Sequence, residues 1–131
     1  MILVDTCVWI DYLKNRTTPQ SQYLTFTTQT WRQEICISGI IYWEVLRGIP
    51  DAGQRDRVAQ SFRRLERRDF FHSSYDEILR NDLACRKRGI ILPGLGDWLI
   101  IQTALDHDLE LLTSDLDFIR ASQYVPIRLV S

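Results

Sequence analysis

Cysteine is scarce in this sequence, and the few cysteines are not spaced as metal ligands or redox pairs. Only three occur among 131 residues, Cys7, Cys36 and Cys85, and none of them forms a CxxC pair. Three cysteines cannot all pair within one chain, so neither a disulfide framework nor a zinc site is indicated. This cysteine content favours a protein of the reducing cytoplasm.

Long apolar runs are missing as well. The opening residues, Met1 to Asp5, have neither the basic segment nor the extended apolar core of a secretion signal. No apolar run approaches the roughly 20 residues that cross a bilayer. We therefore expect a cytoplasmic protein without membrane contact, and 131 residues fit a single domain spanning 1–131 around one hydrophobic core.

Lysine is nearly absent from the positive charges. Of 16 basic residues only Lys14 and Lys87 are lysines, and the net charge is -1. Six arginines lie between Arg55 and Arg68, and a second basic group surrounds Lys87. Arginine suits phosphate because its planar group donates two hydrogen bonds at once. Solvated helix faces explain these clusters equally well, so alone they do not indicate a nucleic-acid partner.

Short apolar runs alternate with amphipathic segments along the chain. We expect strands at 2–4, 35–38, 109–113 and 125–130, a short strand opening at 70–71, and helices at 7–13, 41–47, 54–68, 75–88, 97–107 and 116–121. Thr6 is the expected cap of the first helix, and Gly48 and Gly89 are expected to end the second and fourth. The stretch 21–33 stays ambiguous because threonines weaken a helix. This alternation predicts an α/β fold whose parallel sheet is covered on both faces.

Four acidic residues occupy positions that such a fold would bring together. Asp5 and Asp115 follow predicted strands, Asp97 opens a predicted helix, and Glu44 lies in the helix after the second strand. Ligands of open parallel sheets bind outside the carboxyl ends of the strands. We therefore expect the four acids to meet at this edge, although a helix cap alone also explains Asp97 or Asp115.

Carboxylates gathered in this way need a compensating charge. Two of them ~4 Å apart repel by roughly 4 kcal/mol at an effective dielectric constant near 20. Oxygen-only ligands favour hard cations such as Mg²⁺ or Mn²⁺. Such an ion could activate water and neutralise charge on a phosphate, so the acids predict metal-assisted phosphodiester hydrolysis.

The segments around these acids resemble the motifs of PIN-domain nucleases. VDTCVWID at 4–11 is similar to their first strand and turn, and ISGI at 37–40 with EVLRG at 44–48 resembles their second acidic motif. GDWLIIQTA at 96–104 is similar to the third motif, and TSDLDF at 113–118 matches a final Thr-x-Asp-x-Asp-Phe. The order and spacing of these motifs agree with those of the family over nearly the full length of the sequence.

The resemblance implies a PIN-like three-layer α/β/α sandwich with a central, mainly parallel sheet. It also implies a metal-dependent endoribonuclease, a hydrolase of RNA phosphodiester bonds, acting as a VapC-type toxin of a toxin–antitoxin pair. A cognate antitoxin, a homodimer, an RNA substrate and Mg²⁺ (or Mn²⁺) follow from the same resemblance. Its site residues carry over as metal-binding acids with two supporting hydroxyls: Asp5, Glu44, Asp97 and Asp115, Asp117 as a conditional fifth acid, and Thr6 and Thr113.

Three aromatic residues depart from the family pattern. Trp98 follows the third acid where a smaller residue is usual, and Tyr42 and Trp43 precede Glu44. Bulky side chains near a site pack in the core more often than they stack on bases. These rings either reshape the groove at the site or pack beneath it, and we favour packing beneath the site.

Two other functions compete with the nuclease. A phosphate-receiving signalling domain also gathers acids at a sheet edge, but it uses a lysine at a strand end, whereas Lys14 and Lys87 fall in predicted helices. A catalytically silent module that binds RNA or a partner would lack one or more of the motif acids. Neither His72 nor His107 matches a catalytic motif.

Overall fold

Five short parallel strands form the centre of the computed structural model, which describes residues 1–130. The strands are β1 (Ile2–Val4), β2 (Ile35–Ile37), β3 (Glu66–Arg67), β4 (Glu110–Leu112) and β5 (Arg128–Leu129). Their order in the sheet is β3-β2-β1-β4-β5, and every pairing is parallel. The predicted α/β fold with a mainly parallel sheet is confirmed.

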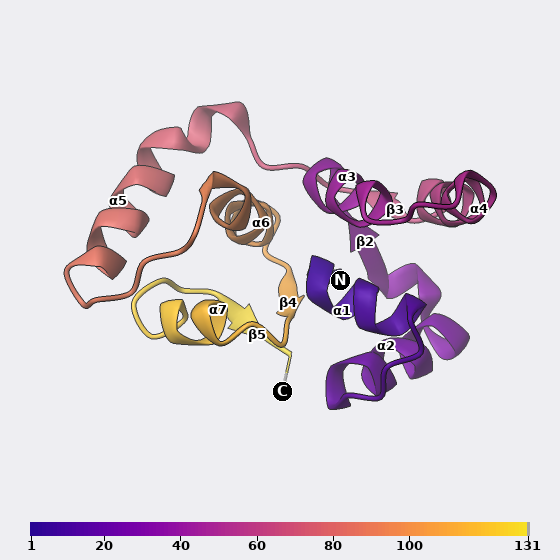
Figure 1. The fold of residues 1–131 in the computed structure, drawn as a ribbon. Coiled ribbons are helices and arrows are strands. Elements are labelled where there is room, and N and C mark those ends of the chain that lie inside the picture. Colours follow the sequence, from indigo (N-terminus) through magenta and orange to yellow (C-terminus); the bar gives the residue numbers. More distant parts are fainter. Residues whose placement is uncertain (131) are drawn as a thin grey trace.

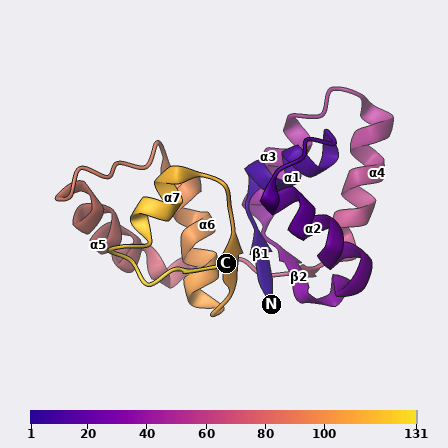
Figure 2. The same cartoon turned by 90° about the horizontal axis from the view of Figure 1, so that it is seen from below.

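Helices cover both faces of this sheet. On one side lie α1 (Thr6–Leu13), α2 (Pro19–Thr30), α3 (Gly39–Arg47) and α4 (Ala52–Arg63). On the other side lie α5 (Tyr75–Arg86), α6 (Leu95–Asp106) and α7 (Leu116–Ala121), as Figures 1 and 2 show. Parallel crossovers are right-handed, so the helices change sides once the chain passes from β3 back across the sheet to β4. The result is a three-layer α/β/α sandwich.

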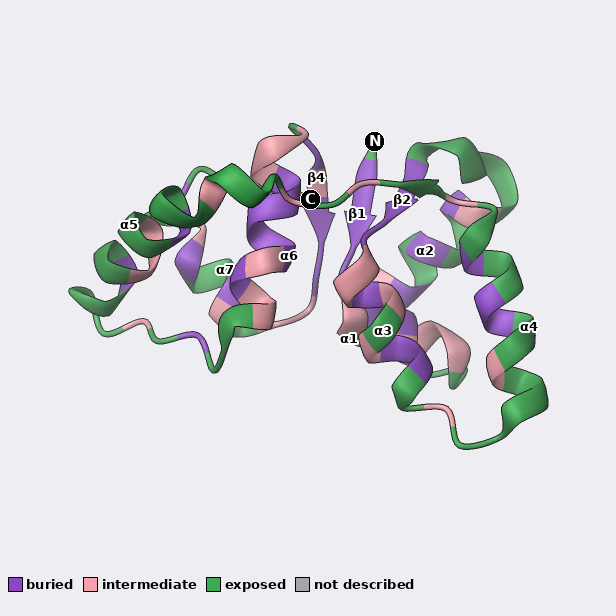
Figure 3. Cartoon of the chain, turned by 90° about the horizontal axis from the view of Figure 1, so that it is seen from above, coloured by how far each residue is buried: buried purple, intermediate pink, exposed green. Residues whose placement is uncertain are grey.

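The central strand β1 and its neighbour β2 are apolar on both faces. All residues of β1 and β2 are buried, which is visible as continuous purple in Figure 3. Buried parallel strands of this kind appear in a sequence as unbroken apolar runs rather than as alternating patterns. From one side α6 adds Ile100, Ile101 and Ala104 to the core. Among residues 1–130, we find no helix with the length and apolar character that a membrane span needs.

The third strand is not where the sequence placed it. β3 consists of Glu66 and Arg67, which pair with β2, whereas the expected strand at 70–71 is absent. The side chain of Phe71 is exposed, and its backbone N–H donates to Asp106 Oδ2 (2.7 Å) instead of to a neighbouring strand. The prediction was wrong because β3 is an exposed edge strand without an apolar signal. The helix expected at 54–68 is also shorter than predicted: α4 ends at Arg63, because Glu66 and Arg67 belong to β3.

The ambiguous stretch at 21–33 is largely helical. Thr18 caps α2 by accepting a hydrogen bond from Ser21 N–H, and the Ser21 hydroxyl accepts one from Thr18 N–H in return. The Thr25 and Thr27 hydroxyls donate back to carbonyls one turn earlier, at 2.9 and 2.8 Å. These bonds satisfy the hydroxyl groups within the helix, so the threonines do not interrupt it.

Two expected helix boundaries change in ways that matter for the site. The cap of α1 is Asp5, whose side chain accepts from Thr6 N–H, so the prediction of Thr6 as the cap was wrong. Helix α6 begins at Leu95, and Asp97 therefore lies inside its first turn. Gly48 and Gly89 end their helices as predicted, but only Gly89 has a positive φ, of 75°.

Candidate active site

Asp5 stands at the carboxyl end of the central strand and is buried. Its Oδ1 accepts from Thr6 N–H (2.7 Å), and its Oδ2 accepts from the Thr113 hydroxyl (2.8 Å) and the Cys7 thiol (3.3 Å). Burial raises the pKa of the Asp5 carboxyl, while these three hydrogen bonds lower it in part. The net direction is upward, so the fold holds this carboxyl where its ionised form needs further positive charge.

Thr113 links Asp5 to the acidic loop that follows β4. Its Oγ1 also accepts from Asp115 N–H (3.0 Å), and the Asp115 side chain caps α7 by accepting from Asp117 N–H (2.8 Å). Asp117 forms a partly exposed ion pair with Arg120 at 3.6 Å. The loop is therefore shaped by its own side chains, and the Asp117 carboxylate is paired with Arg120.

Glu44 joins the cluster from α3. Its Oε1 accepts a 2.8 Å hydrogen bond from the Thr6 hydroxyl. A Cβ placed on Gly96 would lie 3.8 Å from Glu44 Oε2, so the first turn of α6 passes close to this carboxylate. Thr6 and Thr113 thus have parallel roles, because each holds one carboxylate through a hydroxyl group.

Asp97 experiences the charges of all the other acids. Burial, together with the charges of Asp5, Asp115, Glu44 and Asp117, raises the pKa of its carboxyl to about 6. Coulombic effects of this kind require proximity. The structure therefore brings together the four acids predicted from the sequence, with Asp117 at the margin of the group.

These acids fit a hard divalent cation by their chemistry. Every donor is a carboxylate oxygen, and mutual repulsion together with burial disfavours the charged form of Asp97, which a bound cation would relieve. Among residues 1–130, no three acidic, histidine or cysteine side chains stand ready-arranged around a single point. The Asp5 and Glu44 carboxylates are held by threonine hydroxyls.

Trp43 and Trp98, expected to pack beneath the site, have opposite environments. Trp98 is buried in the core, as predicted. Trp43 is 55% exposed on α3, so the prediction that it packs in the core was wrong. Tyr42 is half-buried, and its hydroxyl accepts from Arg63 at 3.1 Å. Helical periodicity explains the difference, because Ile41, Val45 and Leu46 face the core and turn Trp43 outward.

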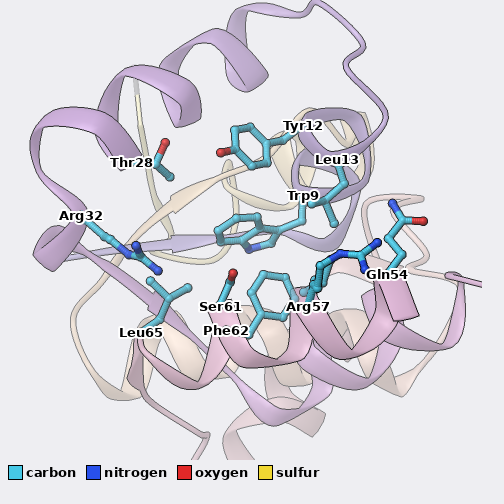
Figure 4. A pocket seen from close by; sticks show the side chains of 11 residues that line it. Trp9, Tyr12, Leu13, Thr28, Arg32, Gln54, Arg57, Ser61, Phe62 and Leu65 are labelled. Carbon is cyan, nitrogen blue, oxygen red and sulfur yellow. The ribbon is translucent and has the colours of Figure 1, made fainter. Parts of the chain in front are cut away.

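A cavity of about 340 Å³, which the sequence did not indicate, lies between α1, α2 and α4 (Figure 4). Trp9 forms a wall of it, is buried, and has an indole N–H without a hydrogen-bond partner among residues 1–130. The aromatic ring of Phe62 lies against Trp9 at a centroid distance of 4.9 Å. The remaining lining residues are Tyr12, Leu13, Thr28, Arg32, Gln54, Arg57, Val58, Ser61 and Leu65. None of the five acids lines this cavity.

A parallel five-stranded α/β/α sandwich with acids gathered at its carboxyl edge defines the class of fold to which this protein belongs. The PIN domain family model matches residues 2–123. The chain is therefore a member of the PIN domain family.

Solved structures share the fold over nearly the whole chain. A chain of VapBC2 from Rickettsia felis, bound to a DNA fragment from its promoter, is 21% identical with a TM-score of 0.75, covering 99% of this chain and 98% of that one. A chain of DNA-bound VapBC from Salmonella typhimurium is 22% identical with a TM-score of 0.74, covering 98% of this chain and 96% of that one. A chain of a toxin–antitoxin complex from Klebsiella pneumoniae is 24% identical with a TM-score of 0.63, covering 90% of each chain. A comparison with curated protein sequences gave no match.

Proposed function

We propose that this PIN domain is a metal-dependent endoribonuclease and the toxin of a VapC-type toxin–antitoxin pair. The observation that carries the proposal is the environment of Asp97, whose pKa is raised to about 6 by burial and by the charges of four other acids. Strongly shifted carboxyl groups in a cluster are typical of active sites. Likeness in fold to chains of toxin–antitoxin complexes supports the toxin assignment.

The proposed cofactor is Mg²⁺, with Mn²⁺ as a substitute. Asp5, Glu44, Asp97 and Asp115 are the residues that would hold it, with Asp117 at the margin. When bound, such a cation supplies positive charge to a phosphate and lowers the pKa of a water molecule.

The threonines support this site through the acids that they hold. Thr113 orients Asp5 through Oδ2, and Thr6 orients Glu44 through Oε1. Both hydroxyls donate to their acids in the present structure, and the same hydrogen bonds would restrict how far the carboxylates rotate.

The positions of the lysines support a nuclease over a phosphate-receiving domain. Lys14 follows the end of α1 and Lys87 follows the end of α5, so neither lies at the carboxyl end of a strand. Labelling with a small phosphodonor would be expected to fail. The catalytically silent alternative predicts firm RNA binding together with weak Mg²⁺ binding by calorimetry.

The proposed partners are an RNA substrate, a second copy of the chain and an antitoxin, all in the cytoplasm. The cavity at Trp9 is our candidate for anchoring an antitoxin side chain. Trp9 and Phe62 supply aromatic walls, the Trp9 indole N–H has no hydrogen-bond partner among the described residues 1–130, and Arg32 and Arg57 also line the cavity. An apolar anchor bearing a hydrogen-bond acceptor, next to an acidic residue, would complement these groups.

The decisive experiment measures RNA cleavage by the purified chain, freed of any antitoxin, in Mg²⁺ and in EDTA. We expect cleavage only with Mg²⁺, and its loss in Asp5→Asn and Asp97→Asn. The matched control is Asp108→Asn, because Asp108 is 91% exposed in its side chain and precedes β4 at the opposite edge of the sheet. Wild-type activity in both site variants, with contaminating nuclease excluded, would overturn the proposal.

A further inference from the structure

Helix α3 presents three neighbouring side chains to solvent beside the acidic site. Trp43 and Arg47 are exposed, and Glu44 is partly exposed between them. Residues three and four apart lie on one face of a helix, so Arg47 is adjacent to both Trp43 and Glu44. One helix face therefore carries an aromatic ring, a candidate metal-binding acid and a positive charge.

The ring of Trp43 is held in place by Arg47. The guanidinium carbon of Arg47 lies 4.3 Å from the centroid of the indole, covering one of its faces. Trp43 nevertheless stays 55% exposed, so more than half of its surface remains open to a second partner. A ring fixed in this way loses little conformational freedom when a second flat group stacks on it.

Two other large apolar side chains close to the acids in the sequence are also exposed. Leu95 lies two residues before Asp97 and is 52% exposed, and Leu116 directly follows Asp115 and is 63% exposed. A regular RNA duplex offers its phosphates and sugars to a protein, whereas unpaired RNA also offers the apolar faces of its bases. Exposed apolar groups beside a phosphate-cleaving centre therefore favour an unpaired substrate.

We propose that Trp43 is a stacking platform for a nucleobase of the RNA that this site binds. Arg47 completes the platform, because its guanidinium both backs the indole and carries positive charge for the adjacent phosphate. This inference rests on the proposed ribonuclease function and adds two residues that bind the substrate. Trp43 acts by binding RNA, whereas the acids act on the bond that is cut.

The test compares RNA binding by exposed-tryptophan variants. The probe is a fluorescein-labelled, unstructured 12-nucleotide RNA, used alone and annealed to its complement, with the full chain in Mg²⁺ and in an Asp97→Asn background that prevents cleavage. Anisotropy is read for Trp43→Ala, Trp43→Phe and the matched control Trp31→Ala. Trp31 is 53% exposed but precedes β2, at the opposite edge of the sheet.

We expect Trp43→Ala to weaken single-strand binding about tenfold, because the variant loses the stacking of one base on the ring. Trp43→Phe should retain most of the affinity because it keeps a ring, Trp31→Ala should bind as the parent does, and duplex binding should be unchanged in every variant. Trp43→Leu, which keeps apolar bulk without a ring, should bind as weakly as the alanine variant while preserving the circular dichroism spectrum.

Three results would overturn the inference. They are equal binding by the Trp43→Ala and Trp31→Ala variants, equal losses on single strand and duplex, and a Trp43-dependent change of oligomeric state in gel filtration, which would make the ring a protein contact. The proposed function is tested separately by Mg²⁺-dependent cleavage in the wild type. Absent cleavage with intact Trp43-dependent binding would refute the nuclease alone, and intact cleavage without a Trp43 effect would refute the platform alone.

Discussion

The hydroxyl of Thr113 donates a 2.8 Å hydrogen bond to Asp5 Oδ2, although the two residues are 108 positions apart in the sequence. The hydroxyl oxygen of Thr113 also accepts a hydrogen bond from Asp115 N–H at 3.0 Å. The register of β1 and β4 brings these residues together, because Val4 is paired with Leu112, and Asp5 and Thr113 are the residues that follow this pair. One hydroxyl thus fixes the relative positions of two proposed metal-binding acids.

Replacing Thr113 with valine should lower Mg²⁺-dependent RNA cleavage. Valine has nearly the same shape but leaves Asp5 and Asp115 N–H without this partner, and loss of a group that orients a metal ligand typically costs 10- to 100-fold. Thr113→Ser, which keeps the hydroxyl, should stay within about threefold of the wild type by the same reasoning. Initial rates at saturating Mg²⁺ provide the measurement, and equal rates for the two variants would contradict a positioning role.

Asp97→Asn should stabilise the protein in EDTA at neutral pH. The pKa of Asp97 is about 6 in the folded state, against an ordinary value of 3.8 for an aspartate in the unfolded chain, so the folded state binds the proton more tightly. Stability from this group is present below pH 4 and is lost as the pH rises through 6. Asparagine does not ionise, so the variant should be more stable by about 1–2 kcal/mol at pH 7.5, allowing for partial exposure, and equal at pH 3.5.

Urea denaturation at the two pH values tests this difference, with Asp108→Asn as the control. Addition of Mg²⁺ should stabilise the wild type more than the Asp97→Asn variant, because only the native site binds the ion. A variant that is less stable than the wild type at pH 7.5 in EDTA would show that the Asp97 carboxylate forms a favourable interaction in the fold.

The acids were predictable because their positions depend on local patterns. An apolar run ending in Asp5 and another ending before Asp115 are features of buried parallel strands, whose carboxyl ends must share one edge. β3 was not predictable, because Glu66 and Arg67 are exposed and pair only through their backbone. The exposure of Trp43 was missed because it depends on which face of α3 meets the core.

The cavity at Trp9 belongs to the same unpredictable class. It depends on how α1, α2 and α4 pack, and these helices come from three separate segments of the chain. No spacing of residues in the sequence specifies a gap between three helices. Local patterns therefore located the polar edge of the sheet but not the apolar cavity between the helices.

All three cysteines should resist alkylation in the native protein. Burial raises the pKa of Cys7 and Cys36 to about 11 and also raises that of Cys85, and the Asp5 charge adds to the effect at Cys7. At pH 8 a thiol with a pKa of 11 is only about 0.1% thiolate, the reactive form. Mass spectrometry after iodoacetamide treatment should show slow modification in buffer and rapid modification in urea. Rapid labelling of native Cys7 would contradict this prediction.

Trp9→Phe should change stability by less than about 1 kcal/mol. The substitution loses part of a buried ring but also removes an N–H that lacks a partner among residues 1–130, and a buried unsatisfied donor costs about 1–3 kcal/mol. Trp9→Ala, which empties the site, should cost about 3–5 kcal/mol. Urea denaturation of both variants gives the comparison, and equal losses would mean that the indole N–H is satisfied by bound water.

The contact between Asp5 and Thr113 also determines when during translation the site can exist. β1 lies in the middle of the sheet, and one of its two neighbours, β4, is synthesised more than 100 residues after it. A nascent chain that has not yet released β4 and Asp115 from the ribosome holds Asp5 without Thr113 and lacks one of the four acids. For the ribonuclease proposed here, an incomplete polypeptide is therefore harmless, and toxicity begins only when almost the whole domain has been made.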